Sequence, residues 1–176
     1  MKSQRLDIRE SIFDDLEYFS KWEREPQVTK FFTIDDGKTY EMIVREFYEW
    51  KDDKTKKQFT ICMADTGIPI GRIYISRIDR KYDSLDITRI YIADTEMRGK
   101  GYGEEALKAI LKWAFEDMNC ERVTLDHFND NMIAAALYEK VGFVREGVMR
   151  HGGKKNGKYV DLCLMAMLRK EYFRVG

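Results

Sequence analysis

The feature that most constrains the fold is a glycine-rich segment between a strand pattern and a helix pattern. Residues 85–92 are rich in side chains that favour strands, and residues 98–103 read Arg-Gly-Lys-Gly-Tyr-Gly. Apolar side chains from Ala106 to Phe115 then recur at helical intervals. Glycines on alternate positions let backbone N–H groups approach a phosphate, and the helix dipole adds partial positive charge there. The segment predicts a strand, a loop and a helix that can hold a pyrophosphate.

Two nucleotide-binding motifs do not fit this loop, whose order is Arg98-x-x-Gly101-x-Gly103. The dinucleotide fingerprint requires G-x-G-x-x-G after a first strand, and the P-loop requires Lys-Ser/Thr after its last glycine. A plain tight turn or helix cap is the alternative for the loop alone.

The rest of the chain continues the alternation of strands and helices. A turn at Asp65-Thr66-Gly67 separates two strand patterns and predicts an antiparallel hairpin. Further strands are expected at 5–10, 58–63, 68–78, 122–127, 143–149 and 159–168, and helices at 13–22, 39–50, 103–118 and 131–141. This order predicts a mixed sheet with helices on its faces, an α/β or α+β layered fold. With 176 residues, two prolines and no internal repeat, residues 1–176 are expected to form a single domain.

Composition argues against several classes of function. Lys and Arg total 31 and so do Asp and Glu, which argues against a nucleic-acid partner. The local basic spots are residues 98–103 and the group Lys154, Lys155 and Lys158. No stretch approaches the ~20 apolar residues of a membrane span, and the N-terminus lacks a signal-peptide pattern. Three separated cysteines without CxxC spacing indicate buried free thiols, no metal site and a cytoplasmic location.

Two motifs together resemble the signature of the GNAT N-acetyltransferase superfamily. The first is the Arg98-x-x-Gly101-x-Gly103 loop, which resembles its acetyl-CoA-binding motif. The second is residues 131–143, which resemble its N-x-x-A-x-x-L-Y-x-x-x-G-F stretch and follow at the expected distance. The resemblance covers roughly residues 58–168 and implies a mixed, mostly antiparallel central sheet of about seven strands, with helices on both faces. The implied enzyme transfers acetyl from acetyl-CoA to an amine.

The resemblance assigns the cofactor contacts. The strand before the loop would pair with the pantetheine arm through Ile90, Tyr91 and Ile92. The pyrophosphate would lie on the loop backbone, formed by Arg98, Gly99, Lys100, Gly101, Tyr102 and Gly103. Arg98 or Lys100 would add charge near the adenosine 3′-phosphate. Asn131 would contact the pantetheine or cap the helix that it begins, and the two roles are compatible.

The resemblance also implies the catalytic residues. Tyr138 is expected to be the general acid that protonates the leaving thiolate. It lies seven residues after Asn131, which puts both on one helix face. Asp126 is the first candidate for the base, directly or through a water, and Asp86 is the second; an exposed strand residue is the alternative for each. His127 should face the opposite side of the sheet from Asp126.

The N-terminal third matches the family only loosely, so the sequence leaves the acceptor open. A protein N-terminus or a small-molecule amine is expected, with polyamine, diamine or aminoglycoside acetylation and a non-catalytic acetyl-CoA sensor as alternatives. Candidate acceptor-binding residues are the aromatics Trp22, Phe31, Phe32, Tyr40, Phe47, Tyr48 and Trp50 and the acids Glu17, Glu23, Glu25, Asp35 and Asp36. The strand edges of the final hairpin could pair two chains in a homodimer.

Overall fold

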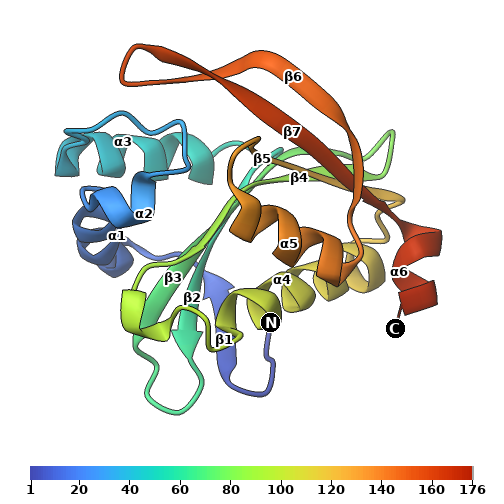
Figure 1. Ribbon diagram of the computed structural model, residues 1–176. Coiled ribbons are helices and arrows are strands. Elements are labelled where there is room, and N and C mark those ends of the chain that lie inside the picture. The colour runs from blue at the N-terminus through green and yellow to red at the C-terminus, as the bar shows by residue number, and fades with distance from the viewer. Residues whose placement is uncertain (176) are drawn as a thin grey trace.

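A computed structural model of the chain describes residues 1–175 and has one seven-stranded sheet (Figure 1). The strands, in their order across the sheet, are β1 (Leu6–Glu10), β2 (Lys57–Met63), β3 (Pro69–Asp79), β4 (Ser84–Ile92), β5 (Arg122–Phe128), β7 (Lys158–Leu168) and β6 (Val144–Lys155). All neighbouring strands are antiparallel except β4 and β5, which are parallel. The mixed, mostly antiparallel sheet is therefore confirmed.

Helices cover both faces of this sheet, as expected (Figure 1). They are α1 (Leu16–Trp22), α2 (Pro26–Thr29), α3 (Tyr40–Lys51), α4 (Tyr102–Lys112), α5 (Met132–Val141) and α6 (Arg169–Val175). Along β2 and β3, the buried side chains of Ile61 and Ile73 join the core under α4. The alternate residues Gln58 and Arg72 face α1 and α3, where Gln58 donates to the Phe47 carbonyl. Because side chains alternate along a strand, β2 and β3 contribute residues to the packing on both faces of the sheet.

The central feature of the sheet is a fork between β4 and β5. The two strands pair only over Ser84–Asp86 and Arg122–Thr124, although both continue for several residues beyond. A register shift on the β3 side of β4 leaves Thr88 as an extra, bulged residue just after the last of these pairs. The two strand edges that face the gap therefore keep backbone groups without a strand partner.

Several elements differ from the sequence prediction. The four-residue helix α2 was not predicted, and α4 passes into a π-helical turn, Trp113–Asp117. The predicted strand 143–149 is the start of a longer strand, because β6 continues to Lys155 after a bulge near Gly153. The β6–β7 hairpin consequently extends far beyond the body of the sheet, toward the segment after α2 (Figure 1).

Candidate active site

The glycine-rich loop ends in a helix start with free backbone donors. The amides of residues 99–104 donate to no acceptor with hydrogen-bonding geometry within residues 1–175, and α4 begins directly at Tyr102. Gly99 and Gly101 have φ of +72° and +84°, which is the left-handed region that favours glycine. A Cβ built on Gly99 would meet nothing within 4 Å. Six consecutive free N–H groups at a helix N-terminus can hold an anion.

A brace from the start of the chain holds this loop. The Arg5 guanidinium donates to the Lys100 carbonyl at 3.0 Å and to the Glu105 carboxylate at 2.7 Å. Glu105 also accepts from the Arg5 amide and from the Ser3 hydroxyl. Burial would raise the pKa of Glu105, but these donors outweigh it and lower the pKa, so the carboxylate stays ionised. Nothing in the local sequence indicated this long-range pair.

Arg98 is bound to the protein itself. Its Nε donates to the Ile92 carbonyl at 3.2 Å and its Nη1 to the Gln27 carbonyl at 3.0 Å. The Arg98 side chain thus connects the glycine-rich loop to the end of β4 and to α2. Lys100 has no side-chain partner among the described residues, which leaves it as the freer of the two predicted cations.

Tyr138 lies on α5 and is 8% exposed. Its ring packs 5.8 Å from the ring of His127 and 6.0 Å from that of Phe143. Burial, followed by the charge of Asp126, raises the pKa of Tyr138 to about 12, so its hydroxyl keeps its proton at neutral pH. Asn131 begins the same helix, and its Oδ1 accepts from the Ala134 amide at 3.2 Å. The predicted cap at Asn131 is therefore present.

The two carboxylates considered as bases lie on one sheet face at the point of the fork. Asp86 is buried and accepts from the hydroxyls of Thr88 and Thr124, at 3.1 and 2.7 Å. Asp126 is exposed as a residue, yet desolvation of its carboxyl, followed by the charge of Asp86, raises its pKa. His127 is buried on the other face of the sheet, as strand alternation predicted. The raised pKa of Asp126 favours proton acceptance by this carboxylate.

A buried charge network lies behind β4, on the face of α1 and α3. The side chain of Glu23 is fully buried and binds Arg72 and Lys38, each at 2.7 Å, and the Tyr91 hydroxyl at 3.1 Å. Burial alone would raise the pKa of Glu23, but the charges of Arg72, Arg89 and Lys38 outweigh it and lower the pKa to about 2. Glu23 is therefore occupied and not free to bind a cationic acceptor, contrary to its candidacy from sequence.

The aromatic candidates separate into two groups. Phe31 packs against Phe128 of β5 with ring centroids 6.3 Å apart, and Phe32 packs against Tyr91 of β4 at 5.7 Å. Trp22 also contacts Tyr91, so these side chains lie beside the fork. Three others lie elsewhere, since Phe47 is in the α1–α3 core, Tyr48 packs on it, and Trp50 packs against Tyr74. Tyr40 is exposed at the start of α3.

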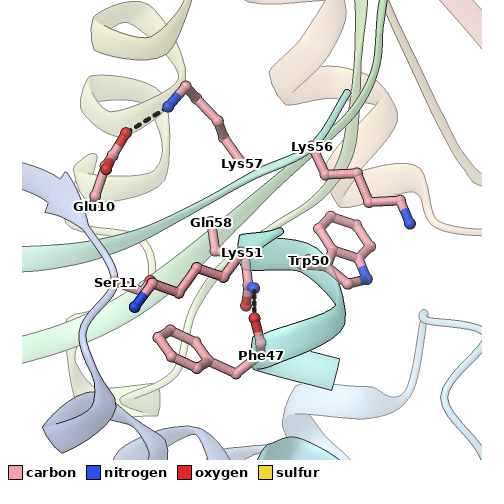
Figure 2. Close-up of a pocket in the computed structure, with 8 residues that line it drawn as sticks. All are labelled: Glu10, Ser11, Phe47, Trp50, Lys51, Lys56, Lys57 and Gln58. Atoms are coloured by element: carbon pink, nitrogen blue, oxygen red, sulfur yellow. Dashed lines mark hydrogen bonds and ion pairs between the residues drawn. The ribbon is translucent and has the colours of Figure 1, made fainter. Parts of the chain in front are cut away.

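A recess of about 120 Å³ lies beside Phe47 and Trp50 (Figure 2). Its lining residues are Glu10, Ser11, Phe47, Trp50, Lys51, Lys56, Lys57 and Gln58. Figure 2 shows two internal interactions here, the Lys57–Glu10 ion pair and the Gln58–Phe47 hydrogen bond. The recess lies at the Glu10 end of β1, whereas Arg5, at the other end, holds the glycine loop. It is therefore separate from the fork.

Comparison with known proteins identifies the family. Residues 5–144 match the family model described as an acetyltransferase (GNAT) domain. The chain belongs to the GNAT acetyltransferase family. Spermidine N(1)-acetyltransferase of Vibrio cholerae is 24% identical, over 98% of this chain and 97% of that protein. A Bacillus licheniformis protein named as the uncharacterized N-acetyltransferase p20 is also 24% identical, over 97% of this chain and 96% of that protein.

The fold of the GNAT chain also matches solved structures. A crystal structure of spermidine N-acetyltransferase from Vibrio cholerae, in complex with CoA and spermine, superimposes with a TM-score of 0.88. It has 22% sequence identity and covers 97% of this chain and 99% of that one. The family and the fold confirm the resemblance drawn from the two motifs. The chain is an acetyl-CoA-dependent N-acetyltransferase that acts on an amine.

The GNAT chain has no helix within residues 1–175 that is long and apolar enough to cross a membrane. The same residues contain no group of three His, Cys, Asp or Glu side chains arranged to hold a metal ion. All three cysteines are buried free thiols, as predicted.

Proposed function

We propose that this GNAT acetyltransferase binds acetyl-CoA in the β4–β5 fork, with the diphosphate on the free amides of residues 99–104. Those six unpaired donors are the observation on which the proposal depends most. The open edge of β4 around Ile90, Tyr91 and Ile92 supplies backbone groups for the pantetheine arm. Asn131 would reach the same arm with its side-chain NH2, which has no partner among the described residues. Lys100 is the proposed contact for the 3′-phosphate.

We further propose that Tyr138 and Asp126 transfer the protons. Acetyl-CoA supplies an acetyl group on a thioester, whose carbonyl carbon forms the new bond to the acceptor nitrogen while the C–S bond breaks. Asp126, directly or through a water, takes the proton that the amine loses, and the Tyr138 hydroxyl gives one to the departing sulfur. The raised pKa of Asp126 favours its acceptance of a proton, and the raised pKa of Tyr138 keeps its hydroxyl protonated and able to donate. Asp86, held by two threonine hydroxyls, would raise the basicity of Asp126 through its charge.

The proposed acceptor is a primary amine on an extended cationic molecule, with spermidine-like polyamines as the first candidates. The adjacent carboxylates Asp86 and Asp126 favour an ammonium group at the fork, and the rings of Phe31, Phe32 and Phe128 can contact a cationic chain. A relative that covers 98% of the chain is named as a spermidine acetyltransferase. A protein N-terminus is the second candidate, because it presents the same amine on an extended chain.

An amine panel tests this function. The protein is incubated with acetyl-CoA and spermidine, a diamine, an aminoglycoside or a peptide with a free N-terminus, and the released thiol is followed colorimetrically. We expect release with at least one amine, highest with spermidine, and a matching acetylated product by mass spectrometry. Cofactor binding without thiol release above background for any amine would instead indicate a sensor.

Asp126→Asn is expected to lower kcat/KM for the amine by about 10²-fold without lowering stability. The folded pKa of Asp126 is above its ordinary value of 3.8, so the ionised carboxylate costs stability as the pH rises through that pKa. Asparagine removes this cost at neutral pH, and the melting temperature should stay the same or rise. Asp130→Asn, on the exposed loop that follows β5, is the matched control. Unchanged turnover in Asp126→Asn would exclude Asp126 as the general base.

The remaining proposals concern the assembly. We propose that residues 1–176 form one domain in the cytosol, where three buried thiols would stay reduced. The outer edge of β6 ends the sheet and could pair with a second copy in a homodimer, which light scattering would detect.

A further inference from the structure

The loop that follows α2 spans the fork between β4 and β5. Phe31 contacts Phe128 on β5, and the next residue, Phe32, contacts Tyr91 on β4, at 6.3 and 5.7 Å between ring centroids. Two consecutive residues thus rest on the two strands that separate. Any displacement of this loop, defined as residues 30–36, changes the entrance between those strands.

The tip of the β6–β7 hairpin is bound to this loop through one ammonium group. Lys155 Nζ lies 2.8 Å from the carbonyl oxygen of Thr29, 3.3 Å from that of Phe32 and 2.8 Å from that of Ile34. An ammonium has three N–H donors, so all of them are used here. Lys155 therefore fixes the backbone on both sides of Phe31 and Phe32, and is not part of a free basic patch with Lys154 and Lys158.

Two neighbours of Lys155 complete the contact. The Asn156 amide donates to Asp35 at 2.6 Å, and the Asn156 side chain exchanges hydrogen bonds with Asp36 at 2.8 and 3.0 Å. Gly153 lies so close that an added Cβ would be 2.8 Å from Thr33 Cγ2. Figure 1 shows the hairpin reaching across the molecule to this region. The close approach of the loop, together with Val160 Cγ2 at 3.1 Å on the neighbouring strand, explains a glycine at this position.

A recess of about 360 Å³ opens beside the contact and is lined in part by Lys155, Asp36 and Thr29. The opposite end of α2 is held by Arg98, which donates to the Gln27 carbonyl from the glycine loop. The segment from α2 to residue 36 is therefore attached to the cofactor loop at one end and to the hairpin at the other.

We propose that the hairpin tip is a latch that sets the position of residues 30–36, with Lys155 as a positioning residue for the amine acceptor. The latch rests on the proposed function in one respect, that the acceptor enters the fork beside Phe31 and Phe32. Release of the latch lets the two rings leave β4 and β5, so the acceptor is held less well in line with the reacting centre. The glycine loop keeps its separate brace from Arg5 and Glu105, so cofactor binding should change little.

Lys155→Met tests the latch, with Lys158→Met as a control that removes an exposed lysine of the same hairpin. In Lys155→Met, kcat/KM for the amine should fall by about 10- to 100-fold, because a displaced loop misplaces the acceptor. KM for acetyl-CoA should remain within about twofold of that of the parent, and Lys158→Met should behave as the parent does. Parent-like kcat/KM for the amine in folded Lys155→Met would overturn the proposal.

A compensating pair gives a second test that keeps Lys155. Gly153→Ala introduces the close contact with Thr33 Cγ2 and should reduce kcat/KM for the amine. Thr33→Ser removes that methyl group, so the double variant should recover much of the loss. This test decides the question if Lys155→Met does not fold, and no loss in Gly153→Ala would contradict the latch.

Hydrogen exchange separates the latch from the proposed function. Amides of residues 30–36 should exchange faster in Lys155→Met than in Lys158→Met, whatever the acceptor is. Equal exchange rates would overturn the latch even in an active enzyme. A parent without transferase activity would overturn the proposed function, and the exchange comparison would still decide whether the latch exists.

Discussion

Replacing Tyr138 by phenylalanine is expected to lower kcat by about 10²-fold or more, which is the usual contribution of a positioned general acid. The hydroxyl makes no hydrogen bond with residues 1–175, so phenylalanine fits the same packing against His127 and Phe143. The melting temperature and the affinity for CoA should therefore stay close to those of the parent. The measurement is thiol release at saturating acetyl-CoA and amine, with calorimetry for CoA binding.

The pH profile gives an independent check on Tyr138. Its pKa of about 12 keeps the proton in place throughout the working range, so kcat should not fall through loss of that proton below about pH 10. The Tyr138→Phe variant should keep the shape of the acidic limb, because that limb belongs to the base and to the amine. Parent-like turnover in Tyr138→Phe would exclude the acid role.

Glu23→Gln is expected to cause the largest loss of stability. It removes the carboxylate that binds Arg72, with both side chains fully buried, and that also binds Lys38. Removing one partner of a buried pair typically costs about 3–5 kcal/mol, because the charge of Arg72 then stays buried without its ion-pair partner, whereas Lys38 keeps its pair with Glu46. For a domain of this size that corresponds to a fall of roughly 6–20 °C in melting temperature. Glu17→Gln, on the exposed side of α1, changes the formal charge equally and is the control.

The lowered pKa of Glu23 also predicts how the stability of the protein depends on pH. The folded pKa of Glu23 is about 2, below its ordinary value of 4.5, so its contribution is complete above 4.5 and is lost as the pH falls toward 2. The parent should lose stability through this range more steeply than Glu23→Gln does. A melting temperature for Glu23→Gln close to that of Glu17→Gln would show that the network does not stabilise the fold.

The sequence predicted the parts of the site whose signals are local. The glycine loop has φ values at Gly99 and Gly101 that require glycine, and Asn131 and Gly142 bound α5 by capping its two ends. These features are encoded within a few residues of one another. Apolar periodicity likewise predicted β4 and the buried face of α4, including Leu107.

The parts that the sequence did not reveal depend on contacts between distant segments. Arg5 and Glu105 are separated by 100 positions, and Lys155 and Phe32 by 123. The residues next to Lys155 in the sequence do not distinguish it from Lys154 or Lys158. Its role becomes visible only from its contacts with the loop at residues 30–36. Glu23 was an acidic candidate for cation binding, and only its burial among three cations shows that it is occupied. Helix α2 was missed because four residues are too short for a periodic signal.

The most direct test of this account is the titration of CoA into the parent and into Gly101→Val, followed by calorimetry. Valine disfavours the φ of +84° and places a Cβ 3.4 Å from Arg5 Nη2, so it should disturb the six free amides. We expect saturable binding in the parent, with Kd between about 1 µM and 1 mM, and at least tenfold weaker binding in folded Gly101→Val, a difference of about 1.4 kcal/mol. No heat of binding in the folded parent at millimolar CoA would contradict the account.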